Sequence, residues 1–237
     1  MDAQELRRYQ EVQGLARDTI DFLRSYIHEG VSESDISHSA EEFMKRRGVT
    51  SFWYHGVGAL VLVGKRTVMS VSGRVYRPSN ELVGRNDLVT VDLSPDIDTY
   101  WGDFARSLVI GNGQVVSDAG PCHPPVLKEL FDGIGIEQRL HQRLLEIATP
   151  EMTYGSLYMQ MNEAITDFGY VNLDFNGNFG HSIEKDKDAR EYIKKGCQRR
   201  LRDKLFTFEP HIARENGSFG YKMEDIYDFS EGSLRKV

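Results

Sequence analysis

Two aspartates stand at neighbouring strand ends in this sequence, in surroundings that otherwise look like protein core. The apolar run Leu88–Val91 ends in Asp92, and Asp103 follows eleven residues later, directly before a second β-prone segment that begins at Phe104. If the two strands pair in antiparallel fashion, facing carboxylates lie only ~5 Å apart at Cβ. Such charges repel, so one would have to take up a proton unless a divalent cation lies between them. The spacing therefore favours a metal site built on paired strands.

The acids of this segment also fit two simpler interpretations. The letters SPD at 94–96 are typical of a turn, and we interpret Asp96 and Asp98 as ordinary hairpin-turn residues. A calcium-binding EF-hand loop that starts at Asp92 is disfavoured, because Ile97 stands where that loop needs glycine and its last position is Asp103 instead of glutamate. The flanking segments are also strand-like, whereas an EF-hand loop joins two helices.

Two carboxylates alone are a weak signal, so a metal site needs further ligands from elsewhere in the chain. NFGHSIE supplies His181, FTFEPHI supplies Glu209 and GYKMEDIYDF supplies Glu224. Each has another interpretation by itself, since a lone histidine is usually structural or exposed and a glutamate before proline usually lies on the surface. In this order, together with the two aspartates, they favour a metal site more than any of them does alone.

The elements that must position these residues follow from the hydrophobic period. Apolar residues recur at steps of three and four over residues 3–29 and 33–47, which predicts two helices. Residues 51–63, 67–72, 87–93 and 104–110 are rich in Val, Leu, Phe and Thr, which predicts strands. Helical spacing returns over 126–148 and 153–168, and the tail from residue 171 is strand-like and turn-rich. An antiparallel sheet flanked by segregated helices is an α+β fold, and no linker divides the chain, so we expect residues 1–237 to form a single domain.

The composition argues against several classes of partner and location. A net charge of −7 over 237 residues disfavours nucleic acid or an anionic membrane as the main partner. No apolar run approaches the ~18 residues of a membrane helix, and the polar segment MDAQE at the start does not resemble a secretory signal. Cys122 and Cys197 form no metal-ligand pattern, so a reduced, cytoplasmic protein is the plain interpretation.

One basic cluster runs against the acidic balance of the chain. We interpret it as a solvated surface segment, with an acidic ligand or partner as the alternative. It comprises Lys194, Lys195, Arg199, Arg200, Arg202 and Lys204.

The order of the candidate ligands resembles that of a known family. It is similar to that of the pita-bread metallopeptidases, which are the methionine aminopeptidases, Xaa-Pro aminopeptidases and prolidases. The shared order is an Asp, a second Asp eleven residues on, Gly-His, F-T-x-E-P and a final x-E-D. VTVDLSPDIDTYWGDFARSLVIG is similar to the family's first two ligand strands, and TPEMTYGSLYMQMNEAITDFGY to the helix before its histidine. The resemblance covers nearly the whole chain. It implies the pita-bread (creatinase/aminopeptidase) fold in a stand-alone catalytic unit, without the extra N-terminal domain of prolidase.

The resemblance also implies a role for each ligand. Asp92 would chelate one metal ion, Asp103 and Glu224 would bridge two, and His181 and Glu209 would complete the second. Such a donor set suits two divalent ions, of Mn²⁺, Fe²⁺, Co²⁺ or Zn²⁺. A bridging water would lose a proton near neutral pH and attack a carbonyl carbon, with Glu209 taking and returning the proton.

The sequence departs from the family at two catalytic histidines. Val75 stands where the family has a histidine before the first aspartate, and Asp188 stands seven residues after His181, where a second one is expected. Loss of such hydrogen-bond donors typically costs about 10²- to 10³-fold in rate each. Either catalysis is weak or other groups replace them.

Several residues are candidates for that replacement or for the substrate pocket. His55 is the first candidate, because FWYHGVG resembles a pocket-lining Tyr-His-Gly of methionine aminopeptidases. Trp53, Tyr54 and His55 would then line the pocket, although core aromatics beside a surface histidine are an equal alternative. The other candidates are Arg74, Tyr76 and His211, whereas we expect His123 and His141 to be exposed.

These features support a metal-dependent hydrolase, of the aminopeptidase or Xaa-Pro dipeptidase class, that cleaves a C–N bond in a short peptide or small amide. The missing histidines favour a specialised substrate over a housekeeping methionine aminopeptidase. The alternatives are a non-catalytic pita-bread module that binds a peptide or protein, and a metal-dependent lyase. The resemblance is also compatible with a homodimer, because many relatives dimerise.

Overall fold

The computed structural model describes residues 2–118, 124–229 and 232–237. Its helices are α1 (Ala3–Tyr26), α2 (Glu33–Arg46), α3 (Pro125–Ile147) and α4 (Tyr154–Asp167), with short 3₁₀ helices at Gly64–Val68, Lys187–Ala189 and Leu201–Asp203. The strands of the first half are β1 (Ser51–Phe52), β2 (Ala59–Val63), β3 (Asp87–Leu93), β4 (Pro95–Ile97), β5 (Tyr100–Trp101), β6 (Phe104–Gly111) and β7 (Gln114–Val116). Those of the second half are β8 (Tyr170–Asn172), β9 (Phe206–Phe208), β10 (His211–Arg214), β11 (Gly220–Lys222), β12 (Asp225–Asp228) and β13 (Arg235–Lys236).

The first two helices begin at local signals in the sequence. The side chain of Asp2 accepts hydrogen bonds from the backbone of Gln4 and Glu5, and Ser32 forms the same kind of capping box at α2. Each helix buries one apolar stripe against the sheet. None of the described helices is both long and apolar enough to span a bilayer.

The central sheet has the order β2-β3-β6-β7 and is antiparallel throughout. Its register pairs Asp92 with Ala105, so Asp103, two residues before Ala105, lies diagonally from Asp92 on the same face. The connection is longer than a plain hairpin, because residues 95–101 leave the sheet and form β4 and β5, of which β4 pairs with β1 and β5 pairs with β4.

That excursion changes the role of one acid. Asp96 is only 4 % exposed and forms an ion pair with Lys187. It is therefore not an ordinary turn residue, as the letters SPD had led us to expect. Asp98, in contrast, is exposed and lies in the β4–β5 turn with a positive φ of 51°.

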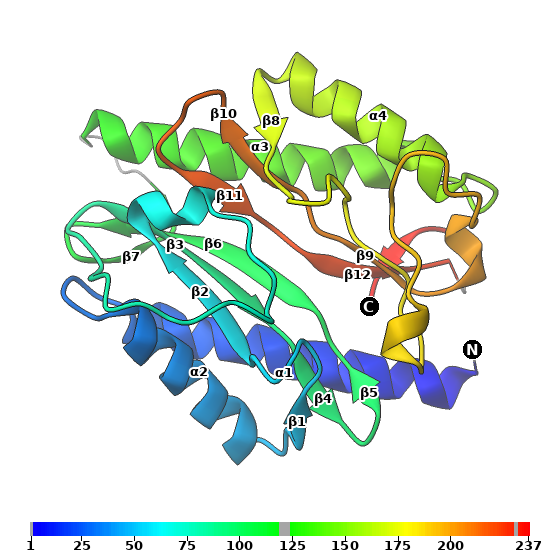
Figure 1. Cartoon of the computed structure of the whole chain (residues 1–237), viewed down its shortest axis with the longest axis horizontal. Coiled ribbons are helices and arrows are strands. Elements are labelled where there is room, and N and C mark those ends of the chain that lie inside the picture. The colour runs from blue at the N-terminus through cyan, green and yellow to red at the C-terminus, as the bar shows by residue number, and fades with distance from the viewer. Residues whose placement is uncertain (1, 119–123, 230–231) are drawn as a thin grey trace.

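Two large apolar cores lie in the two halves of the molecule, and a third, smaller cluster joins Tyr9 and Trp101 of the first half to residues of the second half. One large core packs α1 and α2 against β2, β3 and β6, and the other packs α3 and α4 against the strands of the second half. In Figure 1 the strands lie between the helix pair α1 and α2 on one side and the pair α3 and α4 on the other. The halves meet where Glu224 forms a β-bridge with Ala105 and donates its N–H to that residue's carbonyl at 3.0 Å.

The predicted α+β class is confirmed, and the predicted helices differ from the observed ones only by a few residues at their ends. The strand predicted over 67–72 is wrong. A 3₁₀ turn occupies Gly64–Val68, because Gly64 adopts φ +60° and the hydroxyl of Thr67 donates back to the Gly64 carbonyl at 2.6 Å. The segment 51–63 is likewise two short strands, interrupted where His55 and Gly56 both have positive φ.

Candidate metal centre

Three carboxylates converge at the junction of the two halves. Asp92 projects from β3, Asp103 precedes β6, and Glu224 is held opposite Ala105 by the bridge between the halves. Each offers an oxygen within 4.8 Å of the others. The diagonal placement expected from the strand pattern thus brings the two aspartates together, and a third acid joins them from the far end of the chain.

The described residues offer too few donors to satisfy the negative charges of all three carboxylates. Burial, reinforced by Asp92, raises the pKa of Asp103 well above its usual range. Burial and then Asp103 do the same to the pKa of Glu224. Glu224 is fully buried, and no hydrogen-bond donor among the described residues contacts either of its carboxylate oxygens. Hard oxygen ligands arranged in this way fit divalent cations.

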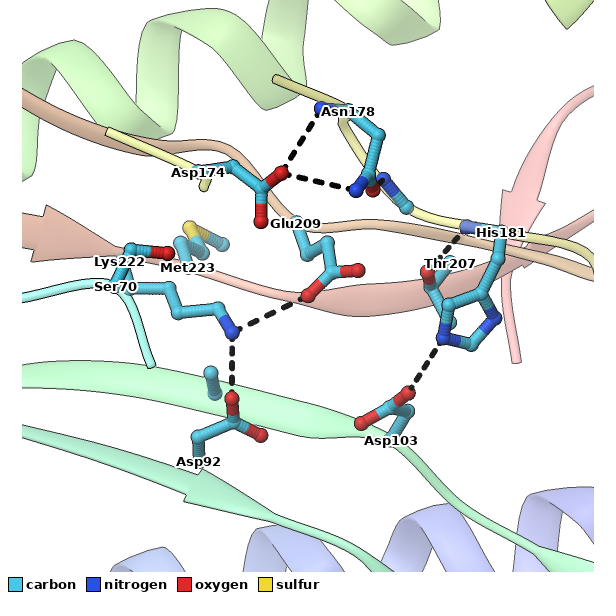
Figure 2. Close-up of polar contacts among 12 residues, drawn as sticks. Ser70, Asp92, Asp103, Asp174, Asn178, His181, Thr207, Glu209, Lys222 and Met223 are labelled. Carbon is cyan, nitrogen blue, oxygen red and sulfur yellow. Dashed lines mark hydrogen bonds and ion pairs between the residues drawn. The ribbon is translucent and has the colours of Figure 1, made fainter. Parts of the chain in front are cut away.

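His181 presents a ring nitrogen to the same cluster (Figure 2). Its Nε2 lies 3.4 Å from Asp103 Oδ2, while Nδ1 donates to the carbonyl of Ser182 at 3.2 Å. Burial lowers the pKa of His181 to about 4, so the ring is neutral and Nε2 keeps its lone pair. A hydrogen bond that fixes the tautomer in this way is typical of metal-binding histidines.

The backbone around His181 is fixed by a close approach. His181 N–H donates to Thr207 Oγ1 at 3.0 Å, and Thr207 N–H donates to the His181 carbonyl at 2.8 Å. The preceding Gly180 has φ +126°, and a Cβ there would lie 2.3 Å from the Thr207 carbonyl oxygen. Only glycine fits at this position, which explains the Gly-His pair in the sequence.

Glu209 lies directly after β9 and points toward the carboxylates from the second half. Burial raises its pKa to about 7, although Lys222 acts in the opposite direction. Its backbone N–H donates to the carbonyl of Phe179 at 2.9 Å, which ties Glu209 to the segment that carries His181.

Lys222 is a member of the cluster that the sequence analysis missed. Its Nζ lies 2.5 Å from Asp92 Oδ2 and 3.2 Å from Glu209 Oε2 (Figure 2). Burial alone would lower the pKa of Lys222, but Asp92, Glu209 and Glu224 together raise it well above its ordinary value. The signal was present in GYKMED, because residues two apart on an extended segment share a face and Lys222 stands two before Glu224.

One cavity of about 110 Å³ contains these groups. Besides five members of the polar cluster it is lined by Trp53, Tyr54 and His211, which are three of the predicted substrate-binding residues. His211 Nε2 donates to the Thr67 carbonyl at 2.8 Å, and burial lowers the pKa of His211 to about 4. At the rim, Asp174 Oδ1 accepts from the backbone N–H and the amide group of Asn178 (Figure 2).

The remaining sequence candidates lie elsewhere. His55 is exposed and lines a separate pocket together with Arg74 and Tyr76, although its ring lies 5.2 Å from that of Tyr54, centroid to centroid. Val75 is 71 % exposed and Asp188 is exposed, and neither lines the cavity. His141 is buried at 3 % exposure, so the expectation that it would be exposed is wrong. His123 lies outside the described residues.

The basic cluster at 194–204 is largely neutralised by neighbouring acids. Arg199 pairs with Glu184 and Glu191, Lys204 also pairs with Glu184, and Arg200 and Arg202 pair with Glu151. Lys194 and Lys195 are exposed. This arrangement agrees with the interpretation of a solvated surface segment.

Comparison with known proteins identifies the family. The model of metallopeptidase family M24 matches residues 6–228. The chain belongs to this family. Methionine aminopeptidase A of Synechocystis sp. is 24 % identical over 90 % of this chain and 79 % of the relative, and the Xaa-Pro dipeptidase of Pyrococcus furiosus is 23 % identical over 89 % of this chain and 55 % of the relative.

Solved structures of M24 enzymes share the fold. The X-Pro aminopeptidase of Thermotoga maritima superposes with a TM-score of 0.80 at 20 % identity, covering 100 % of this chain and 61 % of that one. The methionine aminopeptidase of Rickettsia prowazekii gives 0.75 at 14 % identity, covering 100 % and 97 %. The chain thus spans about three fifths of the first enzyme and nearly all of the second. The predicted resemblance and the predicted pita-bread fold are both confirmed.

Proposed function

We propose that this chain is a metal-dependent hydrolase that cleaves a C–N bond of a short peptide or small amide. Asp92, Asp103, His181, Glu209 and Glu224 would hold two divalent ions, in the roles given by the family resemblance. The observation that carries the proposal is the convergence of three carboxylates, with both oxygens of the buried Glu224 left without a donor among the described residues. Glu209 and the neutral imidazole of His181 line the cavity beside them. Mn²⁺, Fe²⁺, Co²⁺ and Zn²⁺ all accept such ligands.

The protein's own groups account for the proton transfers of such a reaction. Bound divalent ions supply Lewis acidity and lower the pKa of water toward neutrality. Glu209, which lines the cavity beside the other proposed ligands, is suited to accept a proton from the attacking water and return it to the leaving nitrogen. Lys222 contacts Oε2 of Glu209, so Oε1 is the oxygen available for that transfer.

The cavity supports a short substrate. It is open to solvent, and its volume of about 110 Å³ accommodates part of a peptide next to the proposed metal ligands. Trp53 and Tyr54 would form an aromatic wall that excludes water, and His211 would contact the substrate from the opposite half. The relatives named for methionine, Xaa-Pro and dipeptide substrates support a peptide as the substrate class.

One observation favours the alternative of a non-catalytic peptide-binding module. The ammonium of Lys222 already offsets part of the charge of Asp92 and Glu209, so the cluster has a cation of its own. If that cation sufficed, the site would not need a metal ion. The four carboxylates outnumber it, however, and this imbalance favours the metal-dependent reading.

Elemental analysis of protein purified without chelator tests the proposal. We expect at least one divalent transition-metal ion per wild-type chain, loss of that ion in Asp103→Ala, and retention in Asp98→Ala, the exposed aspartate of the same segment. Hydrolysis of a dipeptide panel should follow the metal content. Metal-free protein even after addition of Mn²⁺ or Co²⁺ would leave the binding module as the better description.

A further inference from the structure

Arg190 lines the same cavity as the proposed metal ligands but belongs to none of the interactions described so far. It directly follows the 3₁₀ helix Lys187–Ala189. Its guanidinium carbon lies 4.5 Å from the ring centroid of Trp53 and 6.0 Å from that of Trp101. Within the described parts of the chain, its buried Nε has no hydrogen-bond partner and its guanidinium forms no ion pair. The aromatic stack therefore holds Arg190 in place without neutralising it.

This lack of an acidic partner is unusual for a partly buried arginine in this protein. Arg66 pairs with Glu33, Arg106 pairs with Asp225, and Arg199 pairs with two glutamates. A guanidinium has five N–H donors in a planar fork that matches a carboxylate. Arg190 thus presents an unused anion-binding fork to the cavity.

The charge of Arg190 reaches the proposed metal centre. It helps to lower the pKa of His181 and opposes the rise in the pKa of Asp103, which places it near both groups. Once two divalent ions offset the four carboxylates, the positive charges of Lys222 and Arg190 remain. Lys222 contacts Asp92 and Glu209, so Arg190 is the cation left for a ligand.

We propose that Arg190 binds the free carboxylate of the substrate, and that the substrates are dipeptides or similar compounds with a carboxylate one residue beyond the scissile bond. This inference rests on the proposed function, because it places the scissile bond at the metal centre. It disfavours long polypeptides, whose carboxyl terminus would be far from the cut.

The test compares free dipeptides with their C-terminal amides, in Mn²⁺-loaded protein. The probes are Met-Ala and Ala-Pro and the amide of each. The variants are Arg190→Gln, Arg190→Lys and, as a matched control, Arg139→Gln, which removes an exposed arginine stacked 4.0 Å from the Phe168 ring outside the cavity. Hydrolysis is measured as kcat/KM by chromatography, and binding before turnover is measured by rapid-mixing tryptophan fluorescence, to which Trp53 contributes.

We expect kcat/KM of the wild type to be about 10- to 100-fold higher for the free acid than for the amide, which is the effect of one charge-assisted hydrogen-bonded pair. Arg190→Gln should abolish this preference by weakening only the free acid, mainly through KM. Arg190→Lys should keep part of it, because the charge remains but the fork is lost. Arg139→Gln should behave like wild type.

Two outcomes would overturn the inference. One is that Arg190→Gln lowers kcat/KM equally for the free dipeptide and for its amide. This would mean that Arg190 contacts the reacting carbonyl or only supports the fold. The other is the absence of acid preference in wild type, which leaves the proposed hydrolase intact if the dipeptides are still cleaved. If no probe is cleaved but wild type binds the acids selectively and Arg190→Gln does not, the proposed hydrolase and its dipeptide substrates fail, and only the binding of carboxylates by Arg190 is retained.

Discussion

Lys222→Met should make the protein bind divalent metal ions more tightly. The substitution keeps the length of the side chain and removes the ammonium that lies 2.5 Å from Asp92 Oδ2 and 3.2 Å from Glu209 Oε2. A metal ion that takes these oxygens must displace Nζ or remain close to it. At a separation of ~4 Å and an effective dielectric constant of ~20, a divalent ion and an ammonium repel by about 8 kcal/mol, twice the value for unit charges.

Most of this repulsion can be relieved if the flexible lysine rotates outward, so the measurable effect is smaller. We expect the dissociation constant for Mn²⁺ to fall by about 10- to 100-fold, or about 1.4–2.8 kcal/mol. Calorimetric titration of chelator-treated protein measures this directly, and the metal-induced rise in melting temperature should increase in parallel.

Lys236→Met is the matched control, because Lys236 pairs with Asp225 at a similar 2.6 Å but does not line the cavity. Its metal affinity should equal that of wild type. Unchanged or weaker Mn²⁺ binding in Lys222→Met would refute the reasoning. It would show that the ammonium belongs to the metal-loaded arrangement and does not compete with it.

Three further predictions concern buried groups outside the proposed ligand set. Glu137→Leu should stabilise the fold by about 1–3 kcal/mol in urea denaturation, because Glu137 is 1 % exposed, burial raises its pKa well above the usual range, and neither oxygen has a partner among the described residues. His141→Gln should reduce the loss of stability on acidification. Burial lowers the pKa of His141 to about 3, so only the unfolded chain takes up this proton below pH ~6.5, and wild type should lose about 2 kcal/mol through this group between pH ~7 and ~5. Gly180→Ala should lower both stability and metal content, because its Cβ would collide with the Thr207 carbonyl.

Each of these has a control in the same region or of the same residue type. Gln138→Leu changes the exposed neighbour of Glu137 and should leave stability nearly unchanged. His28→Gln removes an exposed histidine and should retain the wild-type pH dependence. Gly135→Ala meets no atom within 4 Å and lies inside α3, so it should stabilise by up to about 1 kcal/mol. Destabilisation by Glu137→Leu, an unchanged acid slope in His141→Gln, or normal metal content in Gly180→Ala would contradict the respective prediction.

The predicted effect of acid on His141 depends on its two hydrogen bonds. Nε2 lies 3.1 Å from the Met223 carbonyl, which can only accept, so Nε2 carries the proton. Nδ1 then accepts from the hydroxyl of Tyr227 at 2.7 Å. A second proton on the ring would remove this acceptor, so the stability is fully present above pH ~6.5 and falls as the pH drops toward 3.

The local parts of the fold could be predicted because their signals are local. Ser32 and Gly48 bracket α2, and the dense Val and Leu run of 87–93 has the observed bounds of β3. The meeting of Asp92 and Asp103 also followed from sequence, since the two-residue period of a strand and an antiparallel register leave them on one face. The strand predicted over 67–72 failed because a glycine turn overrode its β propensity.

The cationic part of the cavity could not be predicted in the same way. Arg190 reaches it through the irregular segment 185–192, which has no hydrophobic period to indicate its path. His55 was expected in the cavity from its resemblance to a family motif, but it lines a separate pocket while its neighbour Tyr54 lines the cavity. Such outcomes depend on contacts between residues far apart in sequence, and neither propensity nor spacing encodes them.

The seam between the two cores has a consequence for the lifetime of the protein. Asp92 and Asp103 belong to the half that contains α1 and α2, whereas His181, Glu209 and Glu224 belong to the other half. A metal ion bound by both sets acts as a clamp, and starvation for that ion leaves like charges facing each other across the seam. Amide exchange at the Ala105–Glu224 bridge would then report metal supply before the helices do. Local opening at this bridge would expose backbone to proteases, so the cellular abundance of the protein would fall with the supply of the metal ion.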